Sequence, residues 1–176
     1  DKKIPDQKLI NNGTIIAGTP ASSIDVKNFF SENEINGLGD EGFTIRTASV
    51  NNKKVIFIAA KNDAGVLYGV FHFLRLLQTH QPVYKLTITS IPKIKLRLLN
   101  HWDNLNRSVE RGYAGISIWN WHTLPDYIDQ RYIDYARANA SVGINGTVLT
   151  NVNANSLVLT KDYLIKVKAL ADAFRP

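Results

Sequence analysis

The sequence predicts an α/β fold in two parts, and two patterns support this prediction. Over residues 1–92, short apolar runs alternate with helical stretches, and turn residues separate them. Over residues 93–176, the order is strand, long loop, helix, strand, loop, helix, which is typical of parallel βα units. We therefore expect a small N-terminal α/β domain with a mixed sheet over 1–92, followed by the start of a second α/β domain over 93–176.

Apolar runs predict the strands of the first domain, at residues 13–18, 42–50, 53–60 and 85–91. Asn51 and Asn52 separate the second run from the third, which predicts a hairpin with a two-residue turn. A helix is expected at 22–33, with Ser22 or Ser23 as its cap.

A longer helix is expected at residues 62–78, where Asp63 can cap the first turn. Apolar side chains recur along it at helical spacing. They predict one buried face, formed by Val66, Leu67, Val70, Phe73, Leu74 and Leu77.

The second domain is expected to contain two strands and two helices, in chain order 94–99, 123–143, 145–152 and 160–174. Thr123 and Asp126 have capping-box spacing at the start of the first helix. Pro125 falls in its first turn and Gly143 ends it. The second strand is expected to be buried, and the second helix to bury one stripe, formed by Leu164, Val167, Leu170 and Phe174.

Two βα units cannot close a barrel, and parallel strands require cover on both faces. We therefore expect 93–176 to be the first two βα units of a truncated (β/α)8 TIM barrel. The chain begins at Asp1 and contains no Met, so we expect that its natural start lies upstream and that no signal peptide remains. Its compartment stays undecided between intracellular, periplasmic and secreted.

Composition excludes several classes of function. The net charge is +6, but residues 1–92 carry ten basic and eight acidic groups and residues 93–176 carry eleven and seven. No run of like charge predicts a nucleic-acid surface, and no apolar run approaches the ~20 residues that span a bilayer. The absence of Cys excludes thiolate metal sites and cysteine nucleophiles in this chain. We expect neither a metal nor a cofactor.

Two unusually polar stretches follow the two predicted strands of the second domain. They are NHWDN at 100–104 and TNVNANS at 150–156. In a βα barrel the loops after the strands form the working face. Both stretches are therefore expected on the same rim.

These stretches also carry a family resemblance, which covers the chain from about Asp40 to its end. The chain resembles the α-glucuronidases of glycoside hydrolase family 67 in the segments LNHWDNL, SVERGYAG and YARANASVGINGTVLTNVNANSLVL. Upstream, GDEGFTIRTASVNNKKVIFIAAKNDAGVLYGVFHFLRLLQ is similar to the N-terminal domain of that family. The family pattern has LDGSIERG where this chain has LNRSVERG, so Asn106 and Arg107 depart from it.

The resemblance implies an inverting glycoside hydrolase that removes (4-O-methyl-)glucuronic acid from xylo-oligosaccharides. Such an enzyme holds a carboxylic acid and a carboxylate base roughly 6.5 to 9.5 Å apart. In the family these carboxylates come from later barrel strands, so no catalytic residue is expected in this chain and the chain alone is expected to be inactive. A homodimer of the full-length enzyme is a further expectation.

The resemblance assigns two residues of this chain to substrate binding. Trp102 and Val152 match the positions that line the apolar pocket around the 4-O-methyl group. A methyl ether offers apolar surface that an indole face and a branched aliphatic side chain can shelter.

Other polar residues allow two interpretations each. Glu110 and Arg111 could grip a sugar or form an ion pair that pins the long loop, and we favour the ion pair. Asn151, with Asn153 and Asn155, could donate to sugar hydroxyls or satisfy turn backbone.

Two pairs of neighbouring residues favour a structural interpretation. His101 and Asp103 are expected to point in different directions, which favours hydrogen bonding within the loop over catalysis. Trp119 and Trp121 could stack on sugar, but packing is favoured.

Two other functions remain open from the sequence. The hairpin and helix over 42–78 also precede the barrels of hexosaminidase-like glycosidases, although NHWDN disfavours that assignment. A non-catalytic carbohydrate-binding module is the other alternative.

Overall fold

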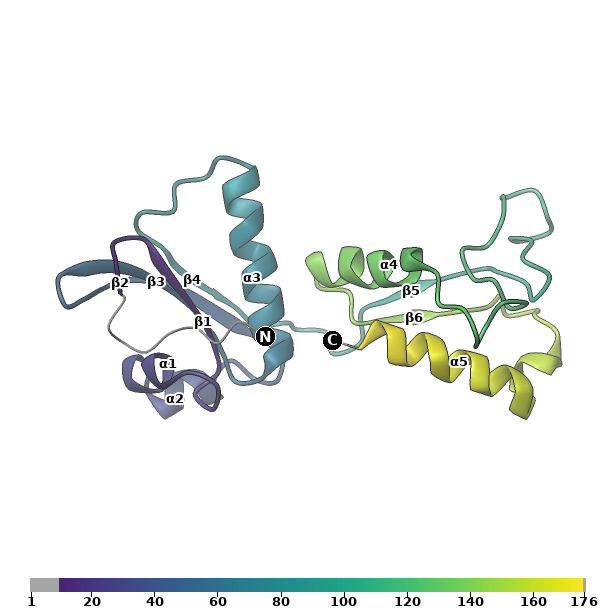
Figure 1. Cartoon of the computed structure of the whole chain (residues 1–176), viewed down its shortest axis with the longest axis horizontal. Helices are drawn as coiled ribbons and strands as arrows, with labels where there is room; N and C mark the ends of the chain where they lie inside the picture. Colours follow the sequence, from purple (N-terminus) through teal and green to yellow (C-terminus); the bar gives the residue numbers. More distant parts are fainter. Residues whose placement is uncertain (1–9, 176) are drawn as a thin grey trace. The chain divides into compact units, whose positions relative to one another are not determined.

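The computed structural model describes residues 10–175, and the chain divides into two compact units, Asp1–Lys95 and Leu96–Pro176. Both units contain helices and strands, as Figure 1 shows, which confirms the α/β class. Each unit is described by itself below.

A four-stranded sheet forms the centre of the first unit. Its strands are β1 (Thr14–Gly18), β2 (Phe43–Val50), β3 (Lys53–Ala60) and β4 (Thr87–Ser90). The order is β1-β3-β2-β4, with β1 parallel to β3 and the other pairs antiparallel, so the sheet is mixed as predicted. Asn51 and Asn52 have φ of 50° and 61°, the left-handed conformation that a tight hairpin turn requires.

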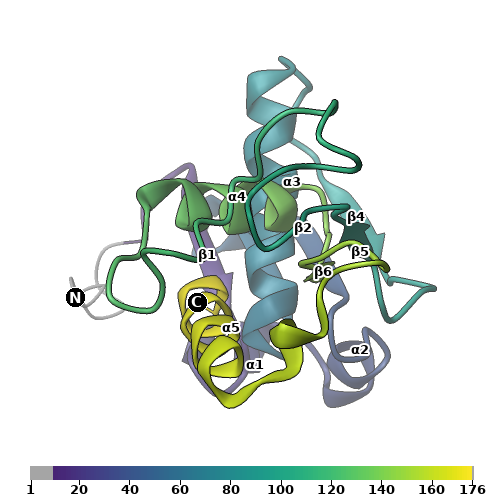
Figure 2. The ribbon, with the colours of Figure 1, turned by 90° about the vertical axis from the view of Figure 1, so that its right-hand side faces the viewer.

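Helices cover both faces of this sheet. The short helices α1 (Ile24–Phe29) and α2 (Glu32–Asn36) lie on one face and α3 (Asp63–Gln78) on the other (Figures 1 and 2). Strand β3 feeds both cores because its side chains alternate: Val55 and Phe57 pack with α1 and α2, while Ile56 and Ile58 pack with α3.

The single helix expected at 22–33 is two helices. Ser23 caps α1, whose last turn ends at Phe29 because the following residue is extended. Ser31 then begins α2 with a reciprocal capping box, in which Glu34 accepts a hydrogen bond from the Ser31 backbone N–H. The Ser-x-x-Glu spacing at 31–34 was the sequence signal for this second start.

Helix α3 buries the expected face only in part: Phe73 is buried and Val66 and Val70 pack against the core, as predicted. Asn62, not Asp63, occupies its cap position, and Leu74 and Leu77 are 42% and 44% exposed. Gly65 and Gly69 are buried instead. A Cβ on Gly65 would lie 2.4 Å from a backbone carbonyl oxygen, so glycine allows the helix axis to approach the sheet closely.

The second unit contains two βα units. Strand β5 (Leu98–Asn100) is followed by a long loop and α4 (Gln130–Ser141), and β6 (Gly146–Val148) is followed by the 3-10 helix η2 (Ser156–Leu159) and α5 (Lys161–Phe174). Strands β5 and β6 pair in parallel. The closed barrel that such units build remains a prediction.

Strands and helix starts in this unit differ from the sequence prediction. Strands β5 and β6 are three residues each, and Val148 is 40% exposed, so the expectation of a buried second strand is wrong for the described residues, where β6 pairs on one side only. Helix α4 begins at Gln130 and not near Thr123. The carboxylate of Asp129 accepts the Arg131 N–H at 2.9 Å and caps the helix there.

An aromatic cluster forms the core of the second unit. Its buried residues are Trp119, Trp121, Leu124, Tyr132 and Leu170. The packing interpretation of the two tryptophans is confirmed, since their side chains are 0% and 1% exposed. Val167 and Phe174 join the cluster as predicted, whereas Leu164 is 50% exposed and Tyr163 packs instead.

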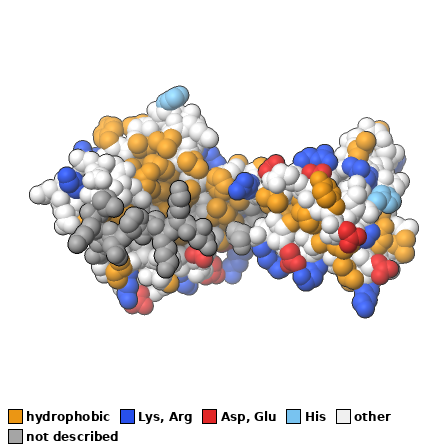
Figure 3. Space-filling view, in the orientation of Figure 1, with side chains coloured by type: hydrophobic (Ala, Val, Ile, Leu, Met, Phe, Trp, Pro, Cys, Tyr) orange, Lys and Arg blue, Asp and Glu red, His pale blue; other side chains and the backbone are white. Residues whose placement is uncertain are grey.

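Hydrophobic side chains also reach the surface of both units, as Figure 3 shows. Within residues 10–175, no helix has the length and apolar character needed to span a bilayer.

Candidate functional site at the ends of β5 and β6

The two polar stretches after β5 and β6 lie side by side, as the sequence predicted for parallel strands. The His101 backbone N–H donates to the Val148 carbonyl at 3.0 Å, which continues the β5–β6 ladder. One step further, the Asn151 N–H donates to the Asp103 carbonyl at 2.8 Å. These two bonds hold the loops together at the carboxyl ends of the strands.

Trp102 points out of this rim. Its side chain is 46% exposed, while Asp103 is 3% exposed and His101 is partly buried. This is the alternation of an extended chain, which sends neighbouring side chains to opposite faces. The Trp102 carbonyl accepts the Glu110 N–H at 2.8 Å, so the long loop folds back against it.

His101 and Asp103 face each other, so the expectation that they point in different directions is wrong. They are two positions apart in an extended segment and therefore share a face. His101 Nδ1 lies 3.7 Å from Asp103 Oδ2, and His101 Nε2 lies 2.7 Å from the Tyr135 hydroxyl of α4. Hydrogen bonding within the fold, the favoured interpretation, agrees with these contacts.

Sequence reasoning missed the partners of His101. The Tyr135 hydroxyl donates to Thr147 Oγ1 of β6 at 3.0 Å, and Thr147 donates to the Leu99 carbonyl of β5 at 3.3 Å. Tyr135 has one hydroxyl proton, which this geometry gives to Thr147, so His101 Nε2 is the donor to Tyr135. Only the helical position of Tyr135 on the core face of α4 hinted at such a contact.

Val152 lies at the tip of the loop after β6 and is 78% exposed. Asn151 and Asn155 use their side chains to shape that loop: Asn151 Oδ1 accepts the Asn153 N–H at 2.9 Å, and Asn155 Oδ1 accepts the Leu157 N–H at 3.0 Å. The side-chain oxygens of both residues thus accept hydrogen bonds from backbone N–H groups of the turn, which was one of the two interpretations.

The ion pair expected between Glu110 and Arg111 does not form. Glu110 has φ of 58° and turns its carboxylate toward Tyr113, whose hydroxyl donates to Oε1 at 3.2 Å. Its second oxygen, Oε2, is buried without a hydrogen-bond partner among the described residues. The loop is pinned instead by Asn104, whose side-chain amide donates to the Glu110 carbonyl at 2.8 Å.

The two departures from the family pattern lie at the tight turn of this loop. Asn106 Oδ1 accepts the Ser108 N–H at 3.0 Å, and Arg107 has φ of 73°. Arg107 stands where the family pattern has Gly, the residue best suited to this left-handed conformation.

A hollow of about 580 Å³ lies beside the long loop in the second unit. Polar residues of both loops line it, among them Asn104, Glu110, Arg111, His122 and Asn155. Mixed carboxylate, guanidinium and amide groups of this kind can hydrogen-bond a polar ligand. The hollow thus brings together Glu110 and Arg111, while Trp102 and Val152 are not part of its wall.

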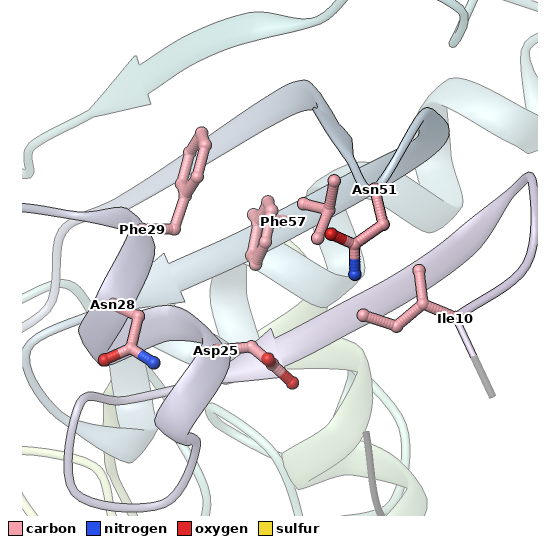
Figure 4. A pocket seen from close by; sticks show the side chains of 7 residues that line it. Ile10, Asp25, Asn28, Phe29, Asn51 and Phe57 are labelled. Atoms are coloured by element: carbon pink, nitrogen blue, oxygen red, sulfur yellow. The ribbon is translucent and has the colours of Figure 1, made fainter. Parts of the chain in front are cut away.

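The first unit has a hollow of its own, of about 380 Å³, drawn in Figure 4. Phe29 stacks on Phe57 with ring centroids 4.3 Å apart and forms an apolar side. Asp25 and Asn28 of α1 and Asn51 of the hairpin turn supply its polar groups. No sequence pattern predicted this hollow, because its residues come from α1, the hairpin of β2 and β3, and the segment before β1.

Comparison with known proteins decides the family. Residues 76–176 match the glycosyl hydrolase family 67 middle domain, and residues 2–73 match the family 67 N-terminus. The chain belongs to glycosyl hydrolase family 67. The match reaches further toward the N-terminus than the resemblance from Asp40 onward, and it disfavours a hexosaminidase-like enzyme or an unrelated binding module.

Two fungal proteins are among the curated relatives of this chain. Alpha-glucuronidase A of Emericella nidulans is 38% identical over 79% of this chain and 16% of its own length. Probable alpha-glucuronidase A of Aspergillus fumigatus is 33% identical over 94% of this chain and 19% of its own length. The chain thus spans less than a fifth of the length of these two relatives.

A solved structure shares the fold. It is a GH138 enzyme targeting pectin rhamnogalacturonan II, with a TM-score of 0.51 and 15% identity, and the match covers 93% of this chain and 18% of that chain. At this identity the likeness concerns the fold alone.

Proposed function

We propose that the protein containing this chain is an α-glucuronidase, an inverting hydrolase that releases (4-O-methyl-)glucuronic acid from xylo-oligosaccharides. Family 67 membership and the alpha-glucuronidase names of the relatives support this proposal. An inverting mechanism needs an acid and a base roughly 6.5 to 9.5 Å apart. Asp103 and Glu110, the two acids of the rim, are not suited to these roles: Asp103 is buried against His101, and Glu110 is bound by Tyr113.

In this proposal the catalytic carboxylates lie outside the chain, and the rim after β5 and β6 supplies one wall of the sugar pocket. Trp102 and Val152 are the residues assigned to the 4-O-methyl group. Their exposure supports the assignment, since apolar side chains of this size at a strand end leave surface that a ligand can bury. Residues 93–176 are then the first βα units of the catalytic barrel, and residues 1–92 are an accessory domain.

Three further residues are weaker candidates for substrate contact: Glu110, Arg111 and Asn151. Glu110 and Arg111 both line the 580 Å³ hollow. Because Glu110 Oε1 accepts from Tyr113 and Oε2 is buried, Arg111 is the residue of the two that we assign to sugar hydroxyls there. Asn151 is only 8% exposed, so we assign it to loop structure before substrate contact.

The observation that carries the proposal is the match of both family domains to nearly the whole chain. The test is release of 4-O-methyl-glucuronic acid from aldouronic xylo-oligosaccharides by this chain and by the full-length gene product. Activity in the full-length protein alone is the expected result. Activity in neither would refute the proposed function, and activity in the short chain would refute the location of the carboxylates.

A further inference from the structure

The direction of Trp102 depends on its two neighbours. His101 and Asp103 turn inward and Trp102 turns outward, so the backbone at Trp102, and with it the direction of its Cα–Cβ bond, cannot turn unless these two side chains leave their places. Asp103 is held by its burial and by the bond from Asn151 to its carbonyl.

His101, which directly follows β5, is held by a series of hydrogen bonds that returns to that strand. It runs from His101 Nε2 to the Tyr135 hydroxyl (2.7 Å), to Thr147 Oγ1 (3.0 Å) and to the Leu99 carbonyl (3.3 Å). These hydrogen bonds link β5, α4 and β6 to the residue that precedes Trp102. A shift of His101 would leave a partly buried hydroxyl without its donor.

Aromatic packing also restrains the His101 and Tyr135 rings. The His101 ring lies 5.2 Å from Trp119 and 5.4 Å from Tyr135, and Tyr135 meets Trp119 edge to face at 5.2 Å. Trp119 is fully buried, so this contact anchors His101 to the core of the unit.

We propose that His101 and Tyr135 are a positioning pair that sets the direction of the Trp102 indole and thereby the preference for a 4-O-methylated substrate. This inference rests on the proposed function for its substrate, but the positioning itself does not. The backbone hydrogen bonds of Trp102 and Asp103 fix the path of the loop. The hydrogen bond between His101 and Tyr135 holds the His101 side chain and thereby the backbone from which the Trp102 Cβ projects.

A spectroscopic test needs no activity. The chain has three tryptophans, so 5-fluorotryptophan labelling gives three ¹⁹F resonances, and Trp102→Phe assigns the one of Trp102. Tyr135→Phe removes only the hydroxyl and keeps the ring packing. We expect it to shift and broaden the Trp102 resonance, while Tyr127→Phe, which removes the hydroxyl of a tyrosine that is 60% exposed, leaves it unchanged.

A double-mutant comparison separates positioning from general stability. If the two residues act as a unit, His101→Phe and the double variant with Tyr135→Phe change the Trp102 resonance equally. Effects that add would overturn the proposal, and so would a Trp102 resonance that Tyr135→Phe does not move.

The functional test uses the full-length enzyme. The ratio of kcat/KM for methylated over unmethylated substrate is measured for wild type, Tyr135→Phe and Tyr127→Phe. We expect the ratio to fall by up to about fourfold in Tyr135→Phe alone, since one sheltered methyl group corresponds to about that factor. An equal loss of kcat/KM on both substrates indicates a merely structural role and overturns the proposal. A wild-type enzyme without glucuronidase activity refutes the proposed function, while the ¹⁹F result still decides the positioning.

Discussion

Replacing Trp102 with Ala tests the sugar wall directly. The indole is half exposed at the end of β5 and lies outside the aromatic core cluster, so its exposed half is free for a ligand. Ala keeps the backbone and the bond from the Glu110 N–H to the carbonyl of this residue. The perturbation therefore removes surface without removing a hydrogen bond.

Two magnitudes follow from this exposure. A tryptophan buries about 150–250 Å² when fully covered, so the covered half of Trp102 corresponds to about 100 Å² and to at most about 2.5 kcal/mol of unfolding free energy. Burial of the substrate methyl group contributes about 0.8 kcal/mol, which is about fourfold in kcat/KM. We expect the ratio of kcat/KM for methylated over unmethylated substrate to fall by this factor.

The assay is a comparison of initial rates on paired substrates that differ only in the methyl group. Because both rates come from the same variant, loss of folded enzyme cancels in the ratio. Urea unfolding of the variant measures the stability term separately. A ratio equal to that of the wild type, in an enzyme that remains active, would refute the pocket assignment of Trp102.

Three other predictions concern the fold. Gly65→Ala is expected to lower the unfolding free energy by about 1–3 kcal/mol. The loss should exceed that of Gly69→Ala, because the Cβ at 65 would meet a backbone carbonyl and the Cβ at 69 a side-chain methyl. Equal urea unfolding midpoints for the two variants would contradict this. Arg107→Val is expected to be about 1–2 kcal/mol less stable than Arg107→Gly because of the left-handed φ, and thermal melts of the two variants decide it. Hydrogen bonds from the backbone N–H and hydroxyl of Ser31, with Arg46 nearby, lower the pKa of Glu34 from 4.5 to about 2. The ionised Glu34 carboxylate therefore stabilises the fold fully above pH 4.5, and this stabilisation is lost as the pH falls toward 2. In Glu34→Gln, the unfolding free energy should no longer show this dependence on pH.

Local sequence signals predicted much of the first unit. The hairpin at Asn51 and Asn52 was predictable because the turn chemistry is local and the strands alternate. The buried face of α3 was predictable only in part: Val66, Val70 and Phe73 pack inward, whereas Leu74 and Leu77 do not. Helical spacing of large apolar residues does not show how close the helix lies to the sheet. Gly65 and Gly69 decide that distance, and their effect depends on a loop and a strand distant in sequence.

The candidate site was predictable in place but not in detail. The parallel order of the strands predicted that the stretches containing Trp102 and Val152 would meet at one rim. The link from His101 to Tyr135 joins residues 34 positions apart, which no periodicity reveals. The ion pair of Glu110 with Arg111 was also predicted wrongly, because the left-handed backbone conformation of Glu110 turns its side chain in another direction.

The aromatic cluster of the second unit also bears on how that unit folds. Trp119, Trp121, Tyr132 and Tyr135 lie within a short span of sequence, whereas β5 and β6 are brief and must be joined across a long intervening segment. Contacts between residues close in sequence form with little loss of chain entropy. We therefore expect the loop before α4 and the helix itself to form a nucleus that precedes strand pairing, so that the rim takes shape last, on a core already assembled beneath it.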